Sequence, residues 1–583
     1  MAKNTHRAGD SCQAVSVTNL HRTFKLLFQH RADDSRVGLE NKKSESEKPE
    51  SQVDVFIVGA GFGGIGQAYA LRNLGLSIKI IDSLPDLGGT WLTNTYPGAL
   101  SDTESFVYRF SWDKEDLQTY PWNRRYLRQP EILAYLRHFA EKHDLRKNME
   151  FNTEMQSAIW DEESHVWEIK ISTGQTFRAR YFITAMGILS KANLPSIPGI
   201  STFEGIVAHT SHWPNNLDVT NKRVGVVGCG ASGVQVITKI APSVASLTAF
   251  IRHPQYTLPS NDRLITPDYR TWANENYDRI WEQLKNSLIG FGYVESNRPF
   301  FSVDPSRRQQ LLEDLWNNGN GMRFMVEHYC DITTNEKANE VVCDFLRNKI
   351  YQIVKDPEKA RKLVPTELFA RRPISNDGYY ETYNRENVSI VDLKEAPIAE
   401  ITSNGLRTED GTVHELDVLV LATGFDAVEG NLVRVNIVGR GGKNLKDAWV
   451  NGPKSYLGSF VAGFPNMFMV NGPKGAFGNV VPAVEASVEF ITHAIERAEA
   501  VREKNGSQGI VEATQEAEDE WGLVCENAAK ENLFNKLKNS WFTGGNIPGK
   551  ALGVRAYFGG LGSYRAIGIS ATKDTWNGFR PFS

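Results

Sequence analysis

The 583-residue sequence has few cysteines, no long apolar run and almost no excess of charge. The five cysteines are scattered and lack CxxC or other metal-ligand spacing, so we expect no disulfide framework and no metal site. No apolar run is long enough to cross a bilayer, which argues against stable membrane insertion. The formal net charge of −4 gives no general attraction to nucleic acid. These absences predict a soluble protein in the reducing cytoplasm.

The first fifty residues differ in composition from the rest. From 38 to 52 almost every residue is charged or polar, and such a segment cannot bury enough apolar surface to become ordered. We therefore predict a flexible N-terminal extension over 1–50. Within it, apolar residues recur at helical spacing beside basic ones, at Val17, Leu20, Arg22, Phe24, Lys25, Leu27 and Arg31. Two interpretations stay open: an organelle-targeting or membrane-surface helix, and a helix that caps the main body.

The remaining chain is long enough for several domains, and its apolar pattern indicates an α/β fold. Apolar runs at 55–58, at 224–227 and, interrupted only by Asp417, at 416–421 are typical of central parallel strands that are covered on both faces. Between about 267 and 364, large apolar and aromatic residues recur at helical spacing without strand-like alternation. This stretch is predicted to be a helical insertion.

The first apolar strand runs directly into a glycine-rich turn. Gly59, Gly61 and Gly64 form a G-x-G-x-x-G motif between this strand and a helical segment. The first glycine permits the tight turn, the second lets backbone N–H groups reach a pyrophosphate, and the third lets helix pack on strand. The next strand ends in Asp82, 23 residues after Gly59, where a carboxylate accepts hydrogen bonds from ribose hydroxyls and repels a 2′-phosphate. This half is predicted to bind an unphosphorylated adenosine diphosphate group such as that of FAD.

A second motif of the same kind follows the strand at 224–227. It comprises Gly228, Gly230 and Gly233, with Ser232 inside the turn. Its selector position, 24 residues after Gly228, carries Arg252 instead of an acid. An arginine fork matches a 2′-phosphate and cannot accept hydrogen bonds from a ribose diol. The second half is therefore predicted to bind NADPH.

Two dinucleotide sites on one chain indicate hydride transfer from nicotinamide to flavin. A single G-x-G-x-x-G motif is weak evidence, but both motifs here follow a strand, open a helix and meet a selector at the expected distance. A disulfide reductase would need a redox-active cysteine pair beside the flavin, and the sequence has none. Oxygen is therefore the leading candidate for the electron acceptor.

Further motifs, in order along the chain, carry a resemblance to a known family. The sequence from Phe203 to Pro214 fits the pattern F-x-G-x-x-x-H-x-x-x-W-P and immediately precedes the second glycine motif. With this fingerprint and the motifs around it, the chain resembles the type I Baeyer–Villiger monooxygenases over about 54–582. The related N- and S-oxygenating flavin monooxygenases usually carry Tyr or Phe where Trp213 stands. The residues that match the motifs of this family include Gly89, Thr90, Trp91, Asp102, Phe203, Gly205, His209, Trp213, Arg371, Arg372 and Trp541.

The resemblance implies that NADPH reduces FAD, that O₂ adds to the reduced flavin, and that the resulting peroxyflavin attacks a ketone. The tetrahedral adduct rearranges to an ester or lactone, and sulfoxidation is an expected side activity. By resemblance, Arg372 is the fixed cation beside the reacting oxygen, and Asp102 orients it. Arg371 is expected to assist Arg252 at the 2′-phosphate, and Trp541 to belong to a control loop that closes over NADP⁺.

The same resemblance implies FAD contacts at Gly89, Thr90 and Asp102, with Trp91 as a wall of the flavin pocket. For the fingerprint residues His209 and Trp213 we favour a role in the linker that coordinates domain motion over direct catalysis.

Two discontinuous Rossmann-like domains are predicted. The FAD-binding domain comprises 51–195 and, with the control loop, 390–550; the NADP-binding domain comprises 196–260 and 367–389, with the helical insertion at 261–366. A tail at 551–583 is expected to pack on the body.

Two rival functions stay open. One is an N- or S-oxygenating flavin monooxygenase, because a shared fold does not determine the acceptor. The other is a catalytically silent NADPH-binding protein, against which the presence of Arg372 and Asp102 argues. The native ketone and the oligomeric state are not predicted.

Overall fold

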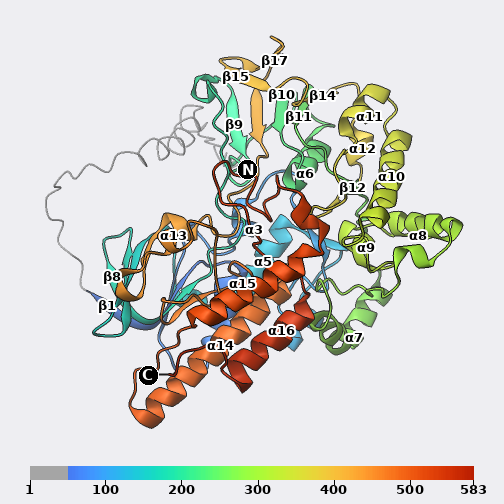
Figure 1. Ribbon diagram of the computed structural model, residues 1–583. Helices are drawn as coiled ribbons and strands as arrows, with labels where there is room; N and C mark the ends of the chain where they lie inside the picture. The colour runs from blue at the N-terminus through green and yellow to red at the C-terminus, as the bar shows by residue number, and fades with distance from the viewer. Residues whose placement is uncertain (1–49, 583) are drawn as a thin grey trace, which may run out of the picture.

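The computed structural model describes residues 50–582, so the predicted N-terminal extension, apart from residue 50, lies outside the described residues. The described chain contains two large sheets with helices packed on them (Figure 1). This architecture confirms the predicted α/β fold class.

The first sheet is built around the strand that the apolar run at 55–58 predicts. β1 (Ser51–Val58) pairs in parallel with β2 (Ile78–Ile81) and with β8 (Thr176–Thr184), and α2 (Phe62–Leu71) connects β1 to β2. The carboxyl ends of β1 and β2 therefore lie side by side. β6, β7 and β8 form an antiparallel ladder, so the sheet is mixed. The strand order is β19-β6-β7-β8-β1-β2-β5, with β20 on β8; the other strands are β5 (Met149–Glu150), β6 (Met155–Asp161), β7 (Val166–Ile171), β19 (Asn436–Val438) and β20 (Met467–Met469).

The second sheet is parallel throughout, as expected for strands that are buried on both faces. α6 (Ala231–Ile240) connects its first central pair, β10 and β11. The carboxyl ends of β10 and β11 lead into the second glycine turn and into Arg252. The strand order is β14-β11-β10-β18-β9, with bounds β9 (Ile206–His209), β10 (Arg223–Val227), β11 (Ser246–Ile251), β14 (Val388–Asp392) and β18 (Val418–Leu421).

Two strands of the second sheet lie at or beyond one predicted domain boundary. The boundary between 389 and 390 falls inside β14, and β18 lies within the range 390–550 that is predicted for the first half. Both strands nevertheless belong to the second sheet, because β14 pairs with β11 and β18 lies between β10 and β9. An antiparallel hairpin ladder joins them, comprising β15 (Ile398–Thr402), β16 (Gly405–Thr408) and β17 (Val413–Glu415).

Between β12 (Thr257–Leu258) and β14 the chain is mainly helical. The helices there are α7 (Pro267–Lys285), α8 (Pro305–Asn318), α9 (Gly321–Val326), α10 (Glu336–Ile353), α11 (Pro357–Leu363) and α12 (Tyr379–Thr382). They do not share one core. The apolar face of α7 joins the core of the first sheet, whereas α8, α9 and α10 enclose a separate core with residues from the C-terminal region.

The C-terminal region returns to the first half (Figure 1). α14 (Val480–Asn505) packs on α2, and α16 (Leu561–Ile569) packs on α14. The hydroxyl of Tyr564, on α16, donates to the carbonyl oxygen of Leu457 at 2.7 Å. The remaining helices are α3 (Thr90–Thr93), α4 (Lys114–Thr119), α5 (Gln129–Lys142), α13 (Leu445–Ala448) and α15 (Gln515–Lys530); two small ribbons pair β3 (Leu100–Glu104) with β4 (Tyr126–Arg128), and β12 (Thr257–Leu258) with β13 (Ile374–Ser375).

Candidate functional site

The first glycine turn has no room for a side chain at Gly59 or at Gly64. Gly59 has a φ of 110°, and a Cβ there would lie 2.3 Å from the carbonyl oxygen of Ala185. A Cβ on Gly64 would lie 1.8 Å from the carbonyl oxygen of Gly59. Helix α2 therefore packs so close to the turn that only glycine fits at this position. No side chain caps α2 at Gly61. Its first backbone N–H groups therefore suit an anionic pyrophosphate.

Asp82 sits beside this turn, as the spacing predicts, and is almost fully buried at 8% exposure. Its Oδ2 accepts a hydrogen bond from Ala60 N at 2.7 Å, and its Oδ1 accepts one from Leu84 N at 2.9 Å. Burial raises the pKa of Asp82, although these two donors act in the opposite direction. Each carboxylate oxygen keeps a second lone pair, so the group can still accept hydrogen bonds from ribose hydroxyls. The first half thus fits an FAD.

The short helix α3 brings a second pair of glycines against the first turn. A Cβ on Gly89 would lie 3.1 Å from the Cα of Gly61, so backbone meets backbone here. Thr90 begins α3, and Trp91 is buried behind it. The indole Nε1 of Trp91 donates to the hydroxyl of Tyr108 at 3.2 Å. Trp91 is thus packed on its ring and held through its indole nitrogen.

The second glycine turn repeats the geometry of the first. Gly228 has a φ of 107°, and a Cβ there would lie 2.4 Å from the carbonyl oxygen of Ala422. A Cβ on Gly233 would lie 2.3 Å from the carbonyl oxygen of Gly228. At Gly230 nothing lies within 4 Å of a Cβ position, and no side chain caps α6. An uncapped helix with open space before it fits the pyrophosphate of NADPH.

Two basic residues directly follow β11, and a carboxylate near the second of them binds a third basic side chain, Arg371. The side chain of Arg252 is exposed and makes no hydrogen bond or ion pair with any residue in 50–582. Nδ1 of His253 lies 3.5 Å from Oε1 of Glu367. Arg371 donates to Oε2 of Glu367 through Nη2 at 2.7 Å and Nε at 3.1 Å, and its Nη1 donates to Asn539 O at 2.9 Å. The sequence motifs predict Arg252 and Arg371 but give no indication of Glu367.

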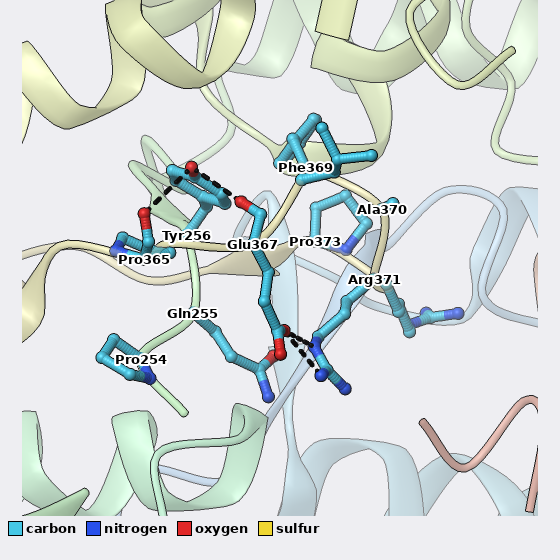
Figure 2. A pocket seen from close by; sticks show the side chains of 11 residues that line it. Pro254, Gln255, Tyr256, Pro365, Glu367, Phe369, Ala370, Arg371 and Pro373 are labelled. Atoms are coloured by element: carbon cyan, nitrogen blue, oxygen red, sulfur yellow. Dashed lines mark hydrogen bonds and ion pairs between the residues drawn. The ribbon is translucent and has the colours of Figure 1, made fainter. Parts of the chain in front are cut away.

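Glu367 and Arg371 border a pocket that Figure 2 shows from close by. Glu367 and Arg371 lie next to each other there, joined by their ion pair, with Gln255 beside them. Arg372 also lines the pocket. Cys229, inside the second glycine turn, is buried, and burial raises the pKa of its thiol to about 12, so it is not a nucleophile at neutral pH.

Arg372 and Asp102, which the resemblance brings together, form a bidentate ion pair although 270 residues separate them. Nη2 of Arg372 lies 2.9 Å from both carboxylate oxygens, and Nε lies 3.2 Å from Oδ2. Both side chains are about three-quarters buried, at 28% and 25% exposure. Asp102 lies on β3, whereas Arg372 lies two residues before β13, so the pair joins two segments that are far apart in the sequence.

A buried asparagine that the sequence motifs do not indicate supports this pair. Asn320 caps α9 with a φ of 79°, and its Nδ2 donates to the carbonyl oxygen of Asp102 at 2.7 Å. The next residue, Gly321, donates its N–H to Ser375 Oγ at 2.9 Å, and a Cβ there would lie 2.3 Å from Cβ of Pro373. One turn of chain therefore contacts the Asp102 strand and the segment after Arg372. In the sequence, the asparagine-glycine pair before a helical segment is the feature that could have indicated this helix cap.

The fingerprint lies on and beside β9, the edge strand of the second sheet. Phe203, His209 and Trp213 are all buried, and a Cβ on Gly205 would lie 2.5 Å from Asp417 O. Nδ1 of His209 lies 2.8 Å from Ser211 Oγ, and burial lowers the pKa of His209 to about 4. The imidazole is therefore neutral at pH 7. These contacts support a packing role.

The predicted control loop contacts the segment that follows β18. Asn546 Nδ2 donates to Phe425 O at 2.8 Å, and Lys550 Nζ donates to Asp426 Oδ1 at 2.7 Å. Trp541 is half-buried and stacks on Phe542, with ring centroids 3.8 Å apart. The loop also touches the basic cluster, because Arg371 binds its Asn539 carbonyl.

Membrane-spanning helices and metal clusters are both absent from the described chain. No helix within residues 50–582 is long and apolar enough to cross a membrane. In the same residues, no group of three or more His, Cys, Asp or Glu side chains is placed to hold a metal ion.

Comparison with known proteins gives consistent similarities. The family model of the pyridine nucleotide-disulphide oxidoreductases matches residues 56–288. A Baeyer–Villiger monooxygenase of Pseudooceanicola batsensis is 46% identical over 525 residues, which cover 89% of this chain and 94% of that protein. A phenazine N-monooxygenase of Lysobacter antibioticus is also 46% identical, over 91% of this chain and 98% of that protein. The crystal structure of a Rhodococcus cyclohexanone monooxygenase bound to NADP⁺ aligns with a TM-score of 0.89 at 46% identity, covering 91% of this chain and 99% of that one.

Proposed function

The chain belongs to the Baeyer–Villiger monooxygenases, which use FAD, NADPH and O₂ to convert ketones to esters or lactones, and we propose that Arg372 and Asp102 are its catalytic pair. The predicted function and the two predicted cofactors are confirmed by the similarity to these relatives. When bound, FAD accepts the hydride of NADPH and supplies one oxygen atom of O₂ to the ketone.

The assignment of the two cofactors to the two halves belongs to the same proposal. The glycine turn at Gly59 and the buried carboxylate of Asp82 would hold FAD, with Gly89, Thr90 and Trp91 along its pocket. The turn at 228–233 and the exposed Arg252 would hold NADPH. Arg371 would assist Arg252 at the 2′-phosphate. We place the second domain at 196–260 and 367–421, since β14 and β18 belong to its sheet.

The observation that carries the catalytic assignment is the unequal use of the Arg372 guanidinium. Nε and Nη2 bind Asp102, whereas Nη1 makes no hydrogen bond to any residue within 50–582. The carboxylate thus fixes the plane of the fork and leaves one edge free to donate. A fixed guanidinium can stabilise an anionic oxygen that develops near the ketone, without itself losing a proton.

Arg372→Ala tests this assignment. The variant should still reduce its flavin with NADPH but form at least 100-fold less ester, since one preorganised donor to a developing anion contributes about that much. Arg372→Lys should also be deficient, because a lysine cannot bind Asp102 through two nitrogens. Flavin absorbance at stopped flow follows the first step, and mass spectrometry of a ketone reaction follows the second. Normal ester formation by Arg372→Ala would refute the assignment.

A second candidate activity is N-oxygenation of an aromatic amine or heterocycle. It is favoured by the phenazine N-monooxygenase, which is as similar to this chain as the Baeyer–Villiger relative. The fingerprint tryptophan, Trp213, favours the ketone instead. Purified chain incubated separately with a panel of ketones, a thioether and phenazine distinguishes the candidates. We expect ester as the main product, sulfoxide as a minor one and little N-oxide.

The chain acts on a small molecule, and we propose a cytoplasmic site of action. The four cysteines within residues 50–582 are all free thiols, three of them buried. Free thiols are usual in a reducing compartment. Immunofluorescence or fractionation of the full chain, with its N-terminal fifty residues intact, would test this location.

A further inference from the structure

The strongest unexplained feature is a carboxylate at the proposed 2′-phosphate end of the second half. Glu367 accepts two hydrogen bonds from Arg371, at 2.7 Å and 3.1 Å, through a single oxygen. Its other oxygen lies 3.5 Å from His253 Nδ1. Figure 2 shows the paired side chains of Glu367 and Arg371 at the pocket. Neither the glycine motif nor the oxygenation chemistry needs an acid at this point.

Contacts place this carboxylate close to the glycine turn and its selector. His253 directly follows Arg252 at the end of β11. Its carbonyl oxygen accepts from Cys229 Sγ, inside the second glycine turn, at 3.2 Å. The positive charge of Arg371 also acts on that thiol. Glu367 therefore lies at the end of the second strand of a nucleotide-binding sheet, where an acid favours a ribose diol and a base favours a 2′-phosphate.

Glu367 is an anion under ordinary conditions. The nearby His253 and Arg371 lower its pKa to about 2, against the opposing effect of partial burial. Its side chain is 28% exposed and that of Arg371 is 17% exposed, so solvent screens the pair only in part. Two of the three guanidinium nitrogens of Arg371 are occupied by Glu367, and the third donates to Asn539. Arg252 alone has no such partner within 50–582.

We propose that Glu367 is a specificity-determining residue that limits the preference of this chain for NADPH over NADH. It does so in two ways: it occupies Arg371, and its negative charge opposes the 2′-phosphate. The inference rests on the proposed function, in which Arg252 and Arg371 lie at that phosphate. A ligand without the 2′-phosphate presents only ribose hydroxyls there, which can donate to the oxygen of a glutamate or of a glutamine. Removing the charge of Glu367 should therefore change the affinity mainly for the phosphorylated ligand.

The test measures the binding of two ligands that differ only in the 2′-phosphate. Adenosine 2′,5′-bisphosphate and 5′-AMP are titrated into the FAD-loaded full chain by calorimetry. In Glu367→Gln, which keeps the shape and removes the charge, the bisphosphate should bind about tenfold more tightly and 5′-AMP should be unchanged. Removing one like charge at close range near the surface has about this effect. FAD absorbance confirms that the variant folds.

Glu400→Gln is the matched control, since Glu400 forms an exposed ion pair with Arg407 on the β15–β16 hairpin. It changes the net charge equally and should leave both affinities unaltered. If Glu367→Gln binds the bisphosphate no better than wild type, or more weakly, Glu367 only supports Arg371 and the inference is overturned.

Arg252→Ala separates this inference from the proposed function. It should weaken the bisphosphate and leave 5′-AMP unchanged. If Arg252→Ala has this effect while Glu367→Gln has none, the inference fails and the 2′-phosphate site stands. If Arg252→Ala changes neither ligand but Glu367→Gln tightens the bisphosphate, the role of Arg252 fails and that of Glu367 stands.

Discussion

The two glycine turns have nearly the same backbone but very different selectors. At the first, Asp82 is buried and holds the turn itself, through Ala60 N. At the second, Arg252 lies exposed without a partner in 50–582, and the neighbouring Arg371 is bound to Glu367. The first selector belongs to the interior of the fold, whereas the second belongs to the surface. This difference suits one ligand that stays bound and another that must enter and leave at each turnover.

The largest effect on stability is expected from substitutions that place a Cβ atom in either glycine turn. Gly59→Ala and Gly228→Ala should each destabilise the chain by about 3–5 kcal/mol, because a Cβ meets a carbonyl oxygen at 2.3 or 2.4 Å and φ is positive. Gly75→Ala is the control: its φ is 70°, but nothing lies within 4 Å, so we expect a cost of about 1 kcal/mol. Melting temperatures compare the three.

Cofactor content then separates the two glycine variants. Gly59→Ala should be purified without FAD, whereas Gly228→Ala should keep FAD and lose NADP⁺ binding. Absorbance after gel filtration and NADP⁺ titration measure the two properties. Full FAD in Gly59→Ala would show that the cofactors are not divided between the halves as proposed.

Lowering the pH should destabilise the fold through His209 in the second half. Its pKa is about 4 in the folded chain, below its usual value near 6.5, because burial disfavours the charged imidazole. The unfolded chain then binds the proton more readily, so stability falls as pH decreases from about 6.5 towards 4. At pH 5 the loss from this residue is about 2 kcal/mol. The melting temperature of His209→Asn should therefore fall less between pH 7 and pH 5 than that of wild type; equal falls would contradict this account.

A smaller effect is expected from Asp82→Asn. The amide keeps one acceptor oxygen, but its NH₂ group faces either Ala60 N or Leu84 N, which are both donors. FAD should bind about tenfold more weakly, since a charged hydrogen-bond acceptor contributes roughly 1.5 kcal/mol or more. NADP⁺ affinity should be unaltered in chain reloaded with FAD. A variant that loses NADP⁺ affinity and retains FAD would reverse the assignment of the halves.

The features that could be predicted from the sequence are those that depend on neighbouring residues. The turns and selectors follow from strand, glycine spacing and helix, all within about 25 residues of each other. The Arg372–Asp102 pair required a resemblance, since no local pattern joins residues 270 apart. Glu367 and Asn320 could not be identified because a surface acid and a turn asparagine are ordinary until their partners are known. The sheet that contains β18 could not be predicted either, because an apolar run indicates a strand but not its neighbours.

The reaction itself tests the central claim most directly. Purified chain with FAD, NADPH and a panel of cyclic and linear ketones is incubated under ¹⁸O₂, and the products are measured by mass spectrometry. The account predicts an ester or lactone that carries one ¹⁸O atom, formed nearly in step with NADPH consumption. Unchanged ketones, with hydrogen peroxide released in proportion to the NADPH consumed, would contradict it.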